Sequence, residues 1–538
     1  MKKYNNPIVD NINKLILSTM GILKRNRIIL YIFILSFLQS FYFLTIDTPL
    51  TSKIPYTISA FIFYLFLRSI SRKLFNVFII FSFIVTCFVF PTLKIYGNID
   101  LDYVNSVFYT NKQEALSYIS ITPLKVYVLL LLLGFFKFLI VRVKHATIIS
   151  KKWKILFLII FLLPPLRKIV KKEPFVPNYI YVLPAKLPYT FALYYNDVKH
   201  QHNFINREIK KVPTWEIISK PDTIAQRNVV VVIGESVRKD FLHSYGFPIE
   251  NTPFIENSNN IQFNNVISAG GHTIPSLLRT ISWADSITNY EMNNNIISLS
   301  KKIGYKTFWI SNQGLKGVHD SPISVIGETA DDFLCLNNQG YREINSFDDE
   351  MLPYFFKILE DKKPKLIVLH MYGSHVSACD RTGGVYDEFI GSEEISCYNK
   401  SIKNLDNFLE KVNSALVNTK QGFDMVYFSD HGMKLENNIL SHGGFYQSNY
   451  DIPLILWSDR IKQSQQINAV RRSYDFLQLF SEITGVKTKN IKRNYTFASE
   501  DSVKNLKTDI ILDDFTDAKL GNYKDLPKNP LSPLFEKE

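Results

Sequence analysis

Two strand-like segments and one turn carry residues that could perform chemistry together. Residues 228–233, NVVVVI, run directly into Gly234, Glu235 and Ser236. Consecutive β-forming residues are typical of a fully buried strand, and α/β sheets bind ligands beyond the carboxyl ends of their strands. Glu235 is therefore a candidate metal ligand, although a carboxylate at this position could equally cap a following helix.

A second acidic residue follows another strand-like segment, and a hydroxyl lies between the two. Residues 425–428 precede the sequence SDHG, in which Asp430 and His431 are adjacent and can both reach one cation. Thr273 lies in the glycine-rich sequence GGHTIP, where taken alone it is an ordinary turn residue. Together the three stretches predict a hydroxyl nucleophile that is activated by a metal ion.

Composition separates the chain into two unlike parts. The chain has 538 residues, too many for one core, and is 46% hydrophobic. In residues 1–172, long apolar runs alternate with short basic loops, which predicts a membrane domain with several α-helical spans. The five predicted spans are residues 28–46, 49–67, 74–93, 126–141 and 153–166.

The basic residues predict the orientation of these spans. Lysines and arginines precede the first span and lie between spans two and three and between spans four and five, which places those segments in the cytoplasm. An odd number of spans then places the rest of the chain on the far side of the membrane. The net charge of +13 is dispersed around apolar spans, so we expect membrane lipids and no nucleic acid as partners.

Two segments outside the predicted spans also carry information: a loop between two spans and the stretch that follows the last span. In the loop 94–123, Thr110 and Glu114 are four residues apart and share one face of a helix. That helix is either a solvated amphipathic helix or a holder for a lipid headgroup. Residues 173–223 are punctuated by proline and predict a connector with interfacial helices.

Residues 224–538 predict an α/β domain with a mainly parallel sheet, because strand-like and helix-like segments alternate along them. The predicted strands are 228–233, 263–268, 307–310, 365–370, 425–428 and 453–457, and the predicted helices are 294–303, 348–360 and 398–416.

The four cysteines predict one disulfide. Cys87 lies in an apolar span, whereas Cys335, Cys379 and Cys397 belong to the outer domain, where disulfides persist. Cys379 and Cys397 bracket a loop rich in glycine and acidic residues, and we favour this pair over a bridge to Cys335.

The order of the motifs resembles the phosphoethanolamine transferases. The shared motifs are GES with Arg238 two residues on, the threonine turn after NNVIS, GSH at 373–375, SDHG at 429–432 and HGG at 442–444. These transferases are inner-membrane enzymes of the alkaline-phosphatase and sulfatase superfamily that modify lipopolysaccharide. The sequence HTIPSLLRTISWAD is more similar to the branch that modifies the lipopolysaccharide core than to the lipid A branch.

The resemblance implies a role for each matching residue. Glu235, Thr273, Asp430 and His431 match the zinc ligands of the family, and Thr273 also matches its nucleophile. His375 and His442 match histidines that handle the phosphoryl group and the protons. Thr110 and Glu114 match substrate-binding loop residues, but Ser106 stands where the family usually has asparagine, with Asn105 beside it.

The resemblance also implies a reaction and its partners. Phosphoethanolamine would pass from phosphatidylethanolamine to Thr273 and on to lipopolysaccharide or lipooligosaccharide, with Zn²⁺ or Mn²⁺ as the cofactor. A phosphoglycerol transferase and a sulfatase or phosphodiesterase on the same fold are the alternative enzymes. A catalytically inactive scaffold that binds lipopolysaccharide is the alternative from another class, and a complete metal-ligand set argues against it.

Overall fold

The computed structural model describes most of the chain and divides it into two compact units. The boundary between them falls, along the chain, between Asp197 and Val198. The described residues are 27–45, 50–96, 104, 119, 122–144, 150–157, 159, 182–221, 227–314, 322–337, 346–436, 438–442, 446–491, 494–503, 506–513 and 519–534.

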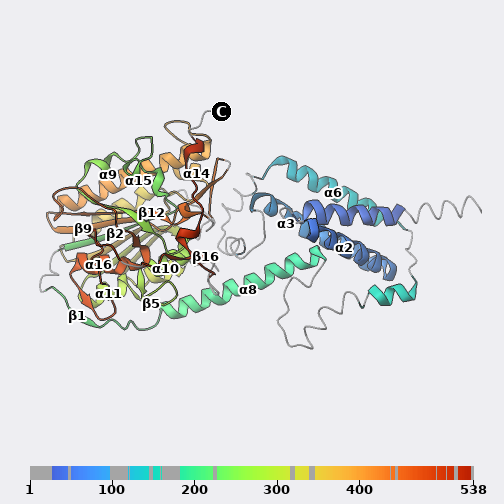
Figure 1. Ribbon diagram of the computed structural model, residues 1–538, viewed down its shortest axis with the longest axis horizontal. Helices are drawn as coiled ribbons and strands as arrows, with labels where there is room; N and C mark the ends of the chain where they lie inside the picture. The colour runs from blue at the N-terminus through green and yellow to red at the C-terminus, as the bar shows by residue number, and fades with distance from the viewer. Residues whose placement is uncertain are drawn as a thin grey trace, which may run out of the picture. The chain divides into compact units, whose positions relative to one another are not determined.

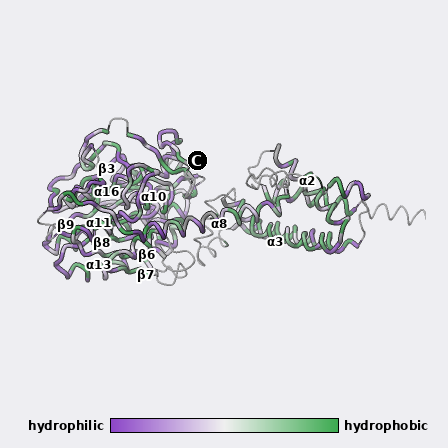
Figure 2. The backbone as a smooth tube through the Cα atoms, turned by 90° about the horizontal axis from the view of Figure 1, so that it is seen from below, coloured by the Kyte–Doolittle hydropathy of each residue, from purple (hydrophilic) through white to green (hydrophobic). Residues whose placement is uncertain are grey.

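The first unit consists of helices that are rich in apolar residues, as the green stretches of α2 and α3 in Figure 2 show. Two helices among the described residues are long and apolar enough to cross a membrane, and they coincide with the third and fourth predicted spans. The helices are Arg27–Phe43, which ends in the π-helix η1 (Gln39–Phe43), α2 (Leu50–Ile70), α3 (Arg72–Tyr96), α6 (Leu124–Arg142) and α8 (Leu183–Ile209), which crosses the unit boundary.

Five spans are not established by these helices. The two apolar helices are Arg72–Lys94, with 23 residues, and Leu124–Arg142, with 19 residues. The first two predicted spans also fall on helices, but neither helix is both long enough and apolar enough to be a candidate for crossing a membrane. Most of the fifth predicted span, 153–166, lies outside the described residues. The predicted domain limits at residues 172 and 223 stay predictions.

Buried polar side chains connect four of these apolar helices. Lys137 of α6 donates to the Ser82 hydroxyl of α3 at 2.9 Å. One turn along α3, the Thr86 hydroxyl accepts from the Gln39 amide at 3.4 Å, and the Tyr64 hydroxyl of α2 donates to Gln39. All five side chains are buried. Because an unsatisfied polar group is costly in an apolar interior, these bonds fix how the helices are rotated against one another.

The second unit is an α/β domain (Figure 1). Its main strands are β2 (Arg227–Gly234), β3 (Ile261–Ile267), β6 (Lys306–Gly314), β7 (Asp332–Asn337), β8 (Lys365–His370), β9 (Gly422–Ser429), β12 (Asp451–Ser458), β13 (Gln465–Ile467) and β14 (Arg471–Arg472). Its helices are α9 (Pro253–Asn257), α10 (Thr273–Thr280), α11 (Ile296–Ile303), α12 (Pro322–Gly327), α13 (Leu352–Leu359), α14 (Ala378–Thr382), α15 (Glu393–Asn418) and α16 (Phe476–Thr484). Each predicted strand and helix of this domain overlaps one of the observed elements.

Shorter strands pair outside the main sheet. β1 (Ile217–Ser219) pairs with β15 (Lys487–Thr488), and β4 (Ser282–Ala284) pairs with β5 (Tyr290–Asn295). β10 (Lys434–Glu436) and β11 (Ile439–Ser441) form a hairpin, and β16 (Asp509–Asp513) pairs with β17 (Lys519–Asn522).

The nine strands of the main sheet are mixed in direction. Their order is β13-β3-β12-β9-β2-β8-β6-β7, with β14 also paired to β3. β9, β2, β8, β6 and β7 are parallel neighbours, whereas β12 runs antiparallel to both β9 and β3. The expected parallel arrangement therefore holds for the half of the sheet around β2, and β12 makes the sheet mixed.

Helices cover both faces of this sheet, which explains why β2 is an unbroken apolar run. Val229, Val231 and Ile233 of β2 pack into one core with residues of α10, α11 and α16. Val230 and Val232 point to the other face and pack with α9, α13 and α15. Figure 1 shows α9 and α15 on one side of the strands and α10, α11 and α16 on the other. A strand buried on both faces needs apolar side chains at every position.

A disulfide joins α14 to α15. It links Cys379 and Cys397, the pair expected from the sequence, with 4.9 Å between their Cα atoms. Cys335 is buried and outside the disulfide, and its Sγ donates to the Gln313 carbonyl oxygen at 2.9 Å. The two cysteines are 18 positions apart in the sequence. The loop that the bridge closes follows the segment that carries His375.

Replacing both bridge cysteines by serine should lower the free energy of unfolding of the second unit by about 3 kcal/mol, because the unfolded chain regains the freedom of the closed loop. Denaturant unfolding of the purified full chain, with and without a thiol reductant, measures the change. Reductant should destabilise the wild type and leave the double variant unchanged. Equal stability of the wild type and the variant under oxidising conditions would contradict the prediction.

Candidate metal centre and active site

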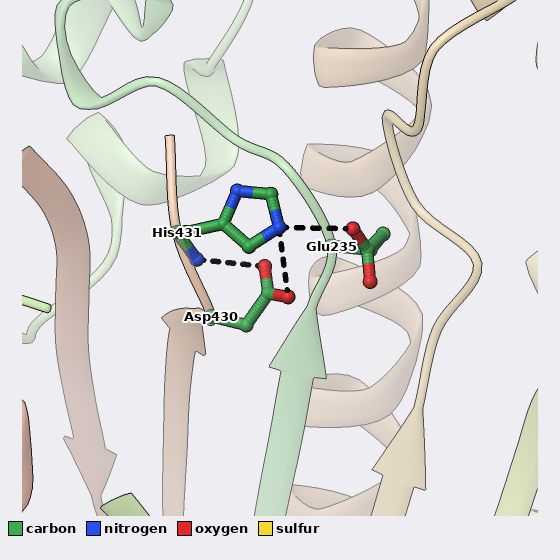
Figure 3. A group of neighbouring side chains, drawn as sticks. All are labelled: Glu235, Asp430 and His431. Atoms are coloured by element: carbon green, nitrogen blue, oxygen red, sulfur yellow. Dashed lines mark hydrogen bonds and ion pairs between the residues drawn. The ribbon is translucent and has the colours of Figure 1, made fainter. Parts of the chain in front are cut away.

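The pairing of β2 with β9 brings three candidate ligands together. The two strands are parallel with Gly234 opposite Ser429, so the next residues, Glu235 and Asp430, emerge side by side. His431 Nε2 lies 3.5 Å from Glu235 Oε1 and 3.3 Å from Asp430 Oδ2. One donor atom from each residue lies within 4.8 Å of the other two, and all three residues are buried (Figure 3). The sequence prediction that these side chains converge therefore agrees with the geometry.

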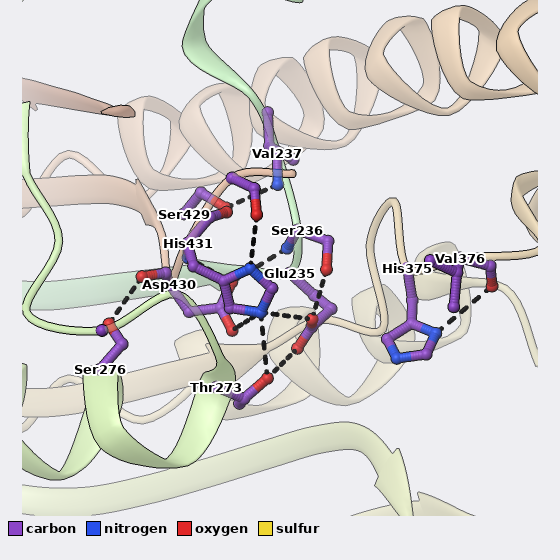
Figure 4. Close-up of polar contacts among 12 residues, drawn as sticks. Glu235, Ser236, Val237, Thr273, Ser276, His375, Val376, Ser429, Asp430 and His431 are labelled. Carbon is purple, nitrogen blue, oxygen red and sulfur yellow. Dashed lines mark hydrogen bonds and ion pairs between the residues drawn. The ribbon is translucent and has the colours of Figure 1, made fainter. Parts of the chain in front are cut away.

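The hydroxyl of Thr273 completes the cluster. Thr273 is the first residue of α10, and its Oγ1 donates to Glu235 Oε2 at 3.1 Å. The same oxygen lies 3.5 Å from His431 Nε2 (Figure 4). Because the amino end of a helix carries partial positive charge, this position favours an anionic oxygen or a phosphoryl group at Thr273.

The backbone after β2 bends sharply to aim Glu235. Ser236 has a φ of 60°, in the left-handed region that non-glycine residues seldom occupy. Its hydroxyl donates to Glu235 Oε1 at 2.7 Å, and its backbone N–H donates to Asp430 Oδ1 at 2.9 Å. Both carboxylates are thus held by one residue whose conformation costs energy, which is typical of functional sites.

Two glycines allow the surrounding loops to approach the cluster. Gly432 follows His431, and a Cβ at this position would lie 2.1 Å from the Ser448 carbonyl oxygen. Gly373 has a φ of 53°, and a Cβ there would lie 2.9 Å from the Glu235 nitrogen. Any other residue at either position would push the loop away from the candidate ligands.

Burial and charge set the protonation of the three candidate ligands. Burial alone would raise the pKa of Glu235, but the hydrogen bond and positive charge of His431 hold that pKa well below its usual range. Burial raises the pKa of Asp430, and the charge of Glu235 raises it further. For His431, burial would lower the pKa, but Asp430 and Glu235 raise it to about 9. A proton on His431 thus compensates two buried carboxylates.

The donor set fits a divalent cation in place of that proton. Asp430 Oδ2 is buried and makes no hydrogen bond among the described residues, and its contact with His431 Nε2 at 3.3 Å is an ion pair only when that ring is protonated. His431 Nδ1 lies 2.8 Å from the Gly432 carbonyl oxygen, and donation to that oxygen leaves Nε2 facing the carboxylates. Two carboxylates, one imidazole and one hydroxyl are ligands that Zn²⁺ accepts in a four-coordinate site.

Three further histidines lie near the cluster. The ring of His442 is 5.1 Å from the rings of both His375 and His431, and the ring of His272 is 6.0 Å from that of His442. Burial lowers the pKa of His442 well below its usual range, and His375 and His431 lower it further. His442 Nε2 is buried and has no hydrogen-bond partner among the described residues.

The position of His375 depends on an aspartate that the sequence analysis did not identify. Asp348 is partly buried, and its carboxylate accepts from the backbone N–H groups of Tyr372 at 2.9 Å and Gly373 at 3.0 Å. The Tyr372 ring stacks on the His375 ring with 5.4 Å between their centres. His370, at the end of β8, is a buried core histidine against Trp309.

Gln313 is a second residue near the site that the sequence analysis missed. Its Nε2 donates to Glu235 Oε2 at 3.3 Å and to the Met371 carbonyl oxygen at 2.8 Å. Gln313 belongs to the carboxyl end of β6, the same edge of the sheet that holds Glu235 and Asp430. In the sequence, the polar residues that follow the apolar half of that strand were the signal from which Gln313 could have been found. The predicted loop residues Ser106, Thr110 and Glu114 lie outside the described residues.

Comparison with known proteins identifies the domain that carries this cluster. The family model described as "Sulfatase" matches residues 227–486, which include Glu235, Thr273, Asp430 and His431. The match spans slightly less than half of the chain.

Several proteins with similar sequences are named phosphoethanolamine transferases. The chain is 37% identical over 297 residues to phosphoethanolamine transferase OpgE of Escherichia coli strain K12, a match that covers 53% of this chain and spans about half of that relative, 55% of its length. It is 25% identical over 435 residues to phosphoethanolamine transferase EptC of the same strain, covering 71% of this chain and 74% of that relative. The resemblance indicated by the sequence motifs is confirmed.

A solved structure shares the fold over most of the chain. It is the integral membrane protein lipooligosaccharide phosphoethanolamine transferase A of Neisseria meningitidis, with a TM-score of 0.54 and 15% sequence identity. The likeness covers 86% of this chain and 96% of that protein. At this identity it shows a common fold and says nothing about substrates.

Binding of Zn²⁺ should release about one to two protons per ion at pH 7, because His431 and a fraction of Asp430 must lose a proton to act as ligands. The affinity should therefore rise between about pH 6 and pH 9, the range below the raised pKa of His431. Calorimetric titration in buffers of different ionisation enthalpy counts the protons.

Two aspartate variants test where the ion binds. Asp430→Asn should weaken Zn²⁺ binding strongly, whereas Asp387→Asn, at an exposed aspartate paired with Lys400 and Lys403, should not change it. Binding without proton release, or with equal affinity in both variants, would contradict the assignment.

Proposed function

We propose that this enzyme transfers phosphoethanolamine from phosphatidylethanolamine to lipopolysaccharide, at a core sugar or at lipid A, through a phosphothreonine intermediate on Thr273. The observation that carries the proposal is the position of the Thr273 hydroxyl, 3.1 Å from Glu235 and 3.5 Å from His431 at the amino end of α10. The names of the similar transferases support phosphoethanolamine as the transferred group.

Glu235, Asp430, His431 and Thr273 would hold the metal ion, which we take to be Zn²⁺, with Mn²⁺ as the other candidate. When bound, the ion would act as a Lewis acid that lowers the pKa of the Thr273 hydroxyl, which makes this hydroxyl a better nucleophile at neutral pH. The protein's own contribution is to orient these groups. Ser236 and Gln313 hydrogen-bond to Glu235, and these bonds keep its carboxylate aimed at the cluster.

The transfer proceeds in two balanced steps. In the first, Thr273 Oγ1 gives up its proton and bonds to phosphorus as the bond from phosphorus to the diacylglycerol oxygen breaks, and that oxygen takes up a proton. In the second, an acceptor oxygen gives up its proton and bonds to phosphorus while the bond to Oγ1 breaks, and Oγ1 takes up a proton. The positive amino end of α10 favours the negative phosphoryl oxygens in both steps.

His375 and His442 would carry the proton transfers and bind the phosphoryl oxygens. The low pKa of His442, caused first by burial, keeps its ring neutral at pH 7, so it can accept a proton from the acceptor hydroxyl. Thr110 and Glu114, with Ser106 beside them, would bind the lipid headgroup. The reaction would take place on the periplasmic face of the inner membrane, which the predicted orientation of the spans supports.

Two other activities would use the same nucleophile. A phosphoglycerol transferase would accept phosphatidylglycerol as donor, and a sulfatase or phosphodiesterase-type hydrolase would use water as acceptor. Sulfatases require a cysteine or serine in a C/S-x-P-x-R sequence, and no such sequence surrounds Thr273. The mass of the transferred group separates the remaining candidates.

Thr273→Ala should reduce transfer roughly 10³-fold or more, because the variant lacks the nucleophile. Mass spectrometry of lipid A and core oligosaccharide, from cells with the wild type and with the variant, measures the product. A phosphoethanolamine increment that requires Thr273 supports the proposal and identifies the acceptor fraction.

The control is Thr288→Ala, at an exposed threonine, which should transfer like the wild type. Thr273→Ser should retain part of the activity, since it keeps a hydroxyl in the same place. A glycerol phosphate increment would favour the phosphoglycerol transferase. Lipopolysaccharide that is identical with and without Thr273 would overturn the proposed acceptor.

A further inference from the structure

The segment after β17 contacts the loops around the active site although it is remote from them in sequence. This C-terminal segment, residues 523–534, contains the short helices η9 (Tyr523–Asp525) and η10 (Ser532–Leu534). Between the two helices, Asn529 bonds to the segment that follows Glu235 and to the hairpin that precedes His442. The mechanism above assigns no role to this residue.

Asn529 first holds Arg238, three residues after Glu235. Its side-chain oxygen accepts from Arg238 Nη1 at 2.8 Å, and its backbone carbonyl oxygen accepts from Arg238 Nη2 at 2.7 Å. Arg238 is fully buried, and Asp240 accepts from its Nε and Nη2. Removing the Asn529 side chain would leave a buried guanidinium nitrogen without this acceptor, which makes the contact specific for an oxygen at that place.

The same side chain pairs with the backbone of Leu435 in β10. Asn529 Oδ1 accepts from the Leu435 N–H at 2.6 Å, and Asn529 Nδ2 donates to the Leu435 carbonyl oxygen at 2.9 Å. A side-chain amide that accepts from the N–H and donates to the C=O of one residue makes the same pair of hydrogen bonds that a residue of a neighbouring strand would make. Leu435 is buried, and the contact binds β10 along the edge that does not pair with β11.

From Leu435 the connection to His442 is short. β10 and β11 form an antiparallel hairpin in which Leu435 pairs with Leu440 and Lys434 pairs with Ser441. His442 follows Ser441 directly. The position of β10 therefore sets where β11 ends and where the His442 ring lies relative to His375 and His431.

The C-terminal segment also fixes the chain on the other side of His442. Gln447 donates its backbone N–H to the Pro527 carbonyl oxygen at 3.0 Å and its side-chain amide to the Tyr523 carbonyl oxygen at 3.3 Å. Ser448 Oγ lies 3.5 Å from Asn529 Oδ1. His442 is thus flanked by two segments that both bond to residues 523–529.

We infer that Asn529 is a positioning residue that sets the placement of His442 against the metal cluster. The inference rests on the proposed function, because it assumes that His442 handles the phosphoryl group and its protons. Glu235, Asp430 and His431 are placed by the β2–β9 pairing, which Asn529 does not touch. Loss of Asn529 should therefore impair transfer through His442 while the metal ligands stay in place.

The test uses the full chain in vesicles that contain labelled phosphatidylethanolamine and measures release of the diacylglycerol product. Asn529→Ala should lower kcat about 10- to 100-fold with KM for the lipid nearly unchanged, because displacing a catalytic group by about 1 Å costs on this order. Zn²⁺ affinity should equal that of the wild type. Asn529→Asp keeps the acceptor for Arg238 and loses the donor to Leu435, so its kcat should be intermediate.

A double-variant cycle separates positioning from general damage. If Asn529 acts through His442, adding Asn529→Ala to His442→Ala should lower the remaining activity by less than about twofold. Equal fold-losses in the wild-type and His442→Ala backgrounds would overturn the inference. So would a fall in Zn²⁺ affinity that parallels the fall in kcat.

The matched control is Asn522→Ala, at the end of β17. Asn522 accepts from the Thr508 hydroxyl and the Lys524 N–H, and this variant should keep the kcat of the wild type. If Asn529→Ala does not fold, Asn529→Asp is carried through the same cycle. Wild-type-like kcat in a folded Asn529→Ala protein overturns this inference alone, whereas an inactive wild type overturns the proposed function.

Discussion

The register between β2 and β9 is the constraint on which the site depends. Because Gly234 lies opposite Ser429, the two strands end together and deliver Glu235 and Asp430 to one point. The ladder continues past the strand ends, where the Asp430 N–H donates to the Gly234 carbonyl oxygen at 3.0 Å. A slip of one residue would turn one carboxylate into the core and remove the cluster.

Two buried carboxylates carry negative charge at an energetic cost that the surrounding residues offset only in part. Backbone and side-chain donors from Ser236, Thr273 and Gln313 neutralise part of the charge, and His431 must carry a proton to supply more. An arrangement that is unfavourable without a cation is well suited to bind one, since the ion takes the place of the proton. The strained φ of Ser236 persists because the pairing on either side leaves no alternative.

The sequence predicted the parts of this architecture that depend on local pattern. Apolar strands followed by Glu235 and by Asp430 and His431 were recognisable because a strand buried on both faces has no polar interruption before its end. The reversed direction of β12 could not be predicted, since strand direction depends on how the chain crosses the sheet. Asn529 was missed for a related reason: an isolated amide in a polar stretch carries no signal until folding brings it to its partner.

The hydrogen bonds of the active site join residues that are far apart along the chain. Ser236 and Asp430 are separated by 194 positions, and Arg238 and Asn529 by 291. During synthesis the ribosome must therefore release nearly the whole second unit before its catalytic loops can close. Until then the valine-rich β2 strand lacks its neighbour β9 and exposes an edge that can aggregate. Long-range closure of this kind is slow, which makes the nascent unit a natural client for chaperones.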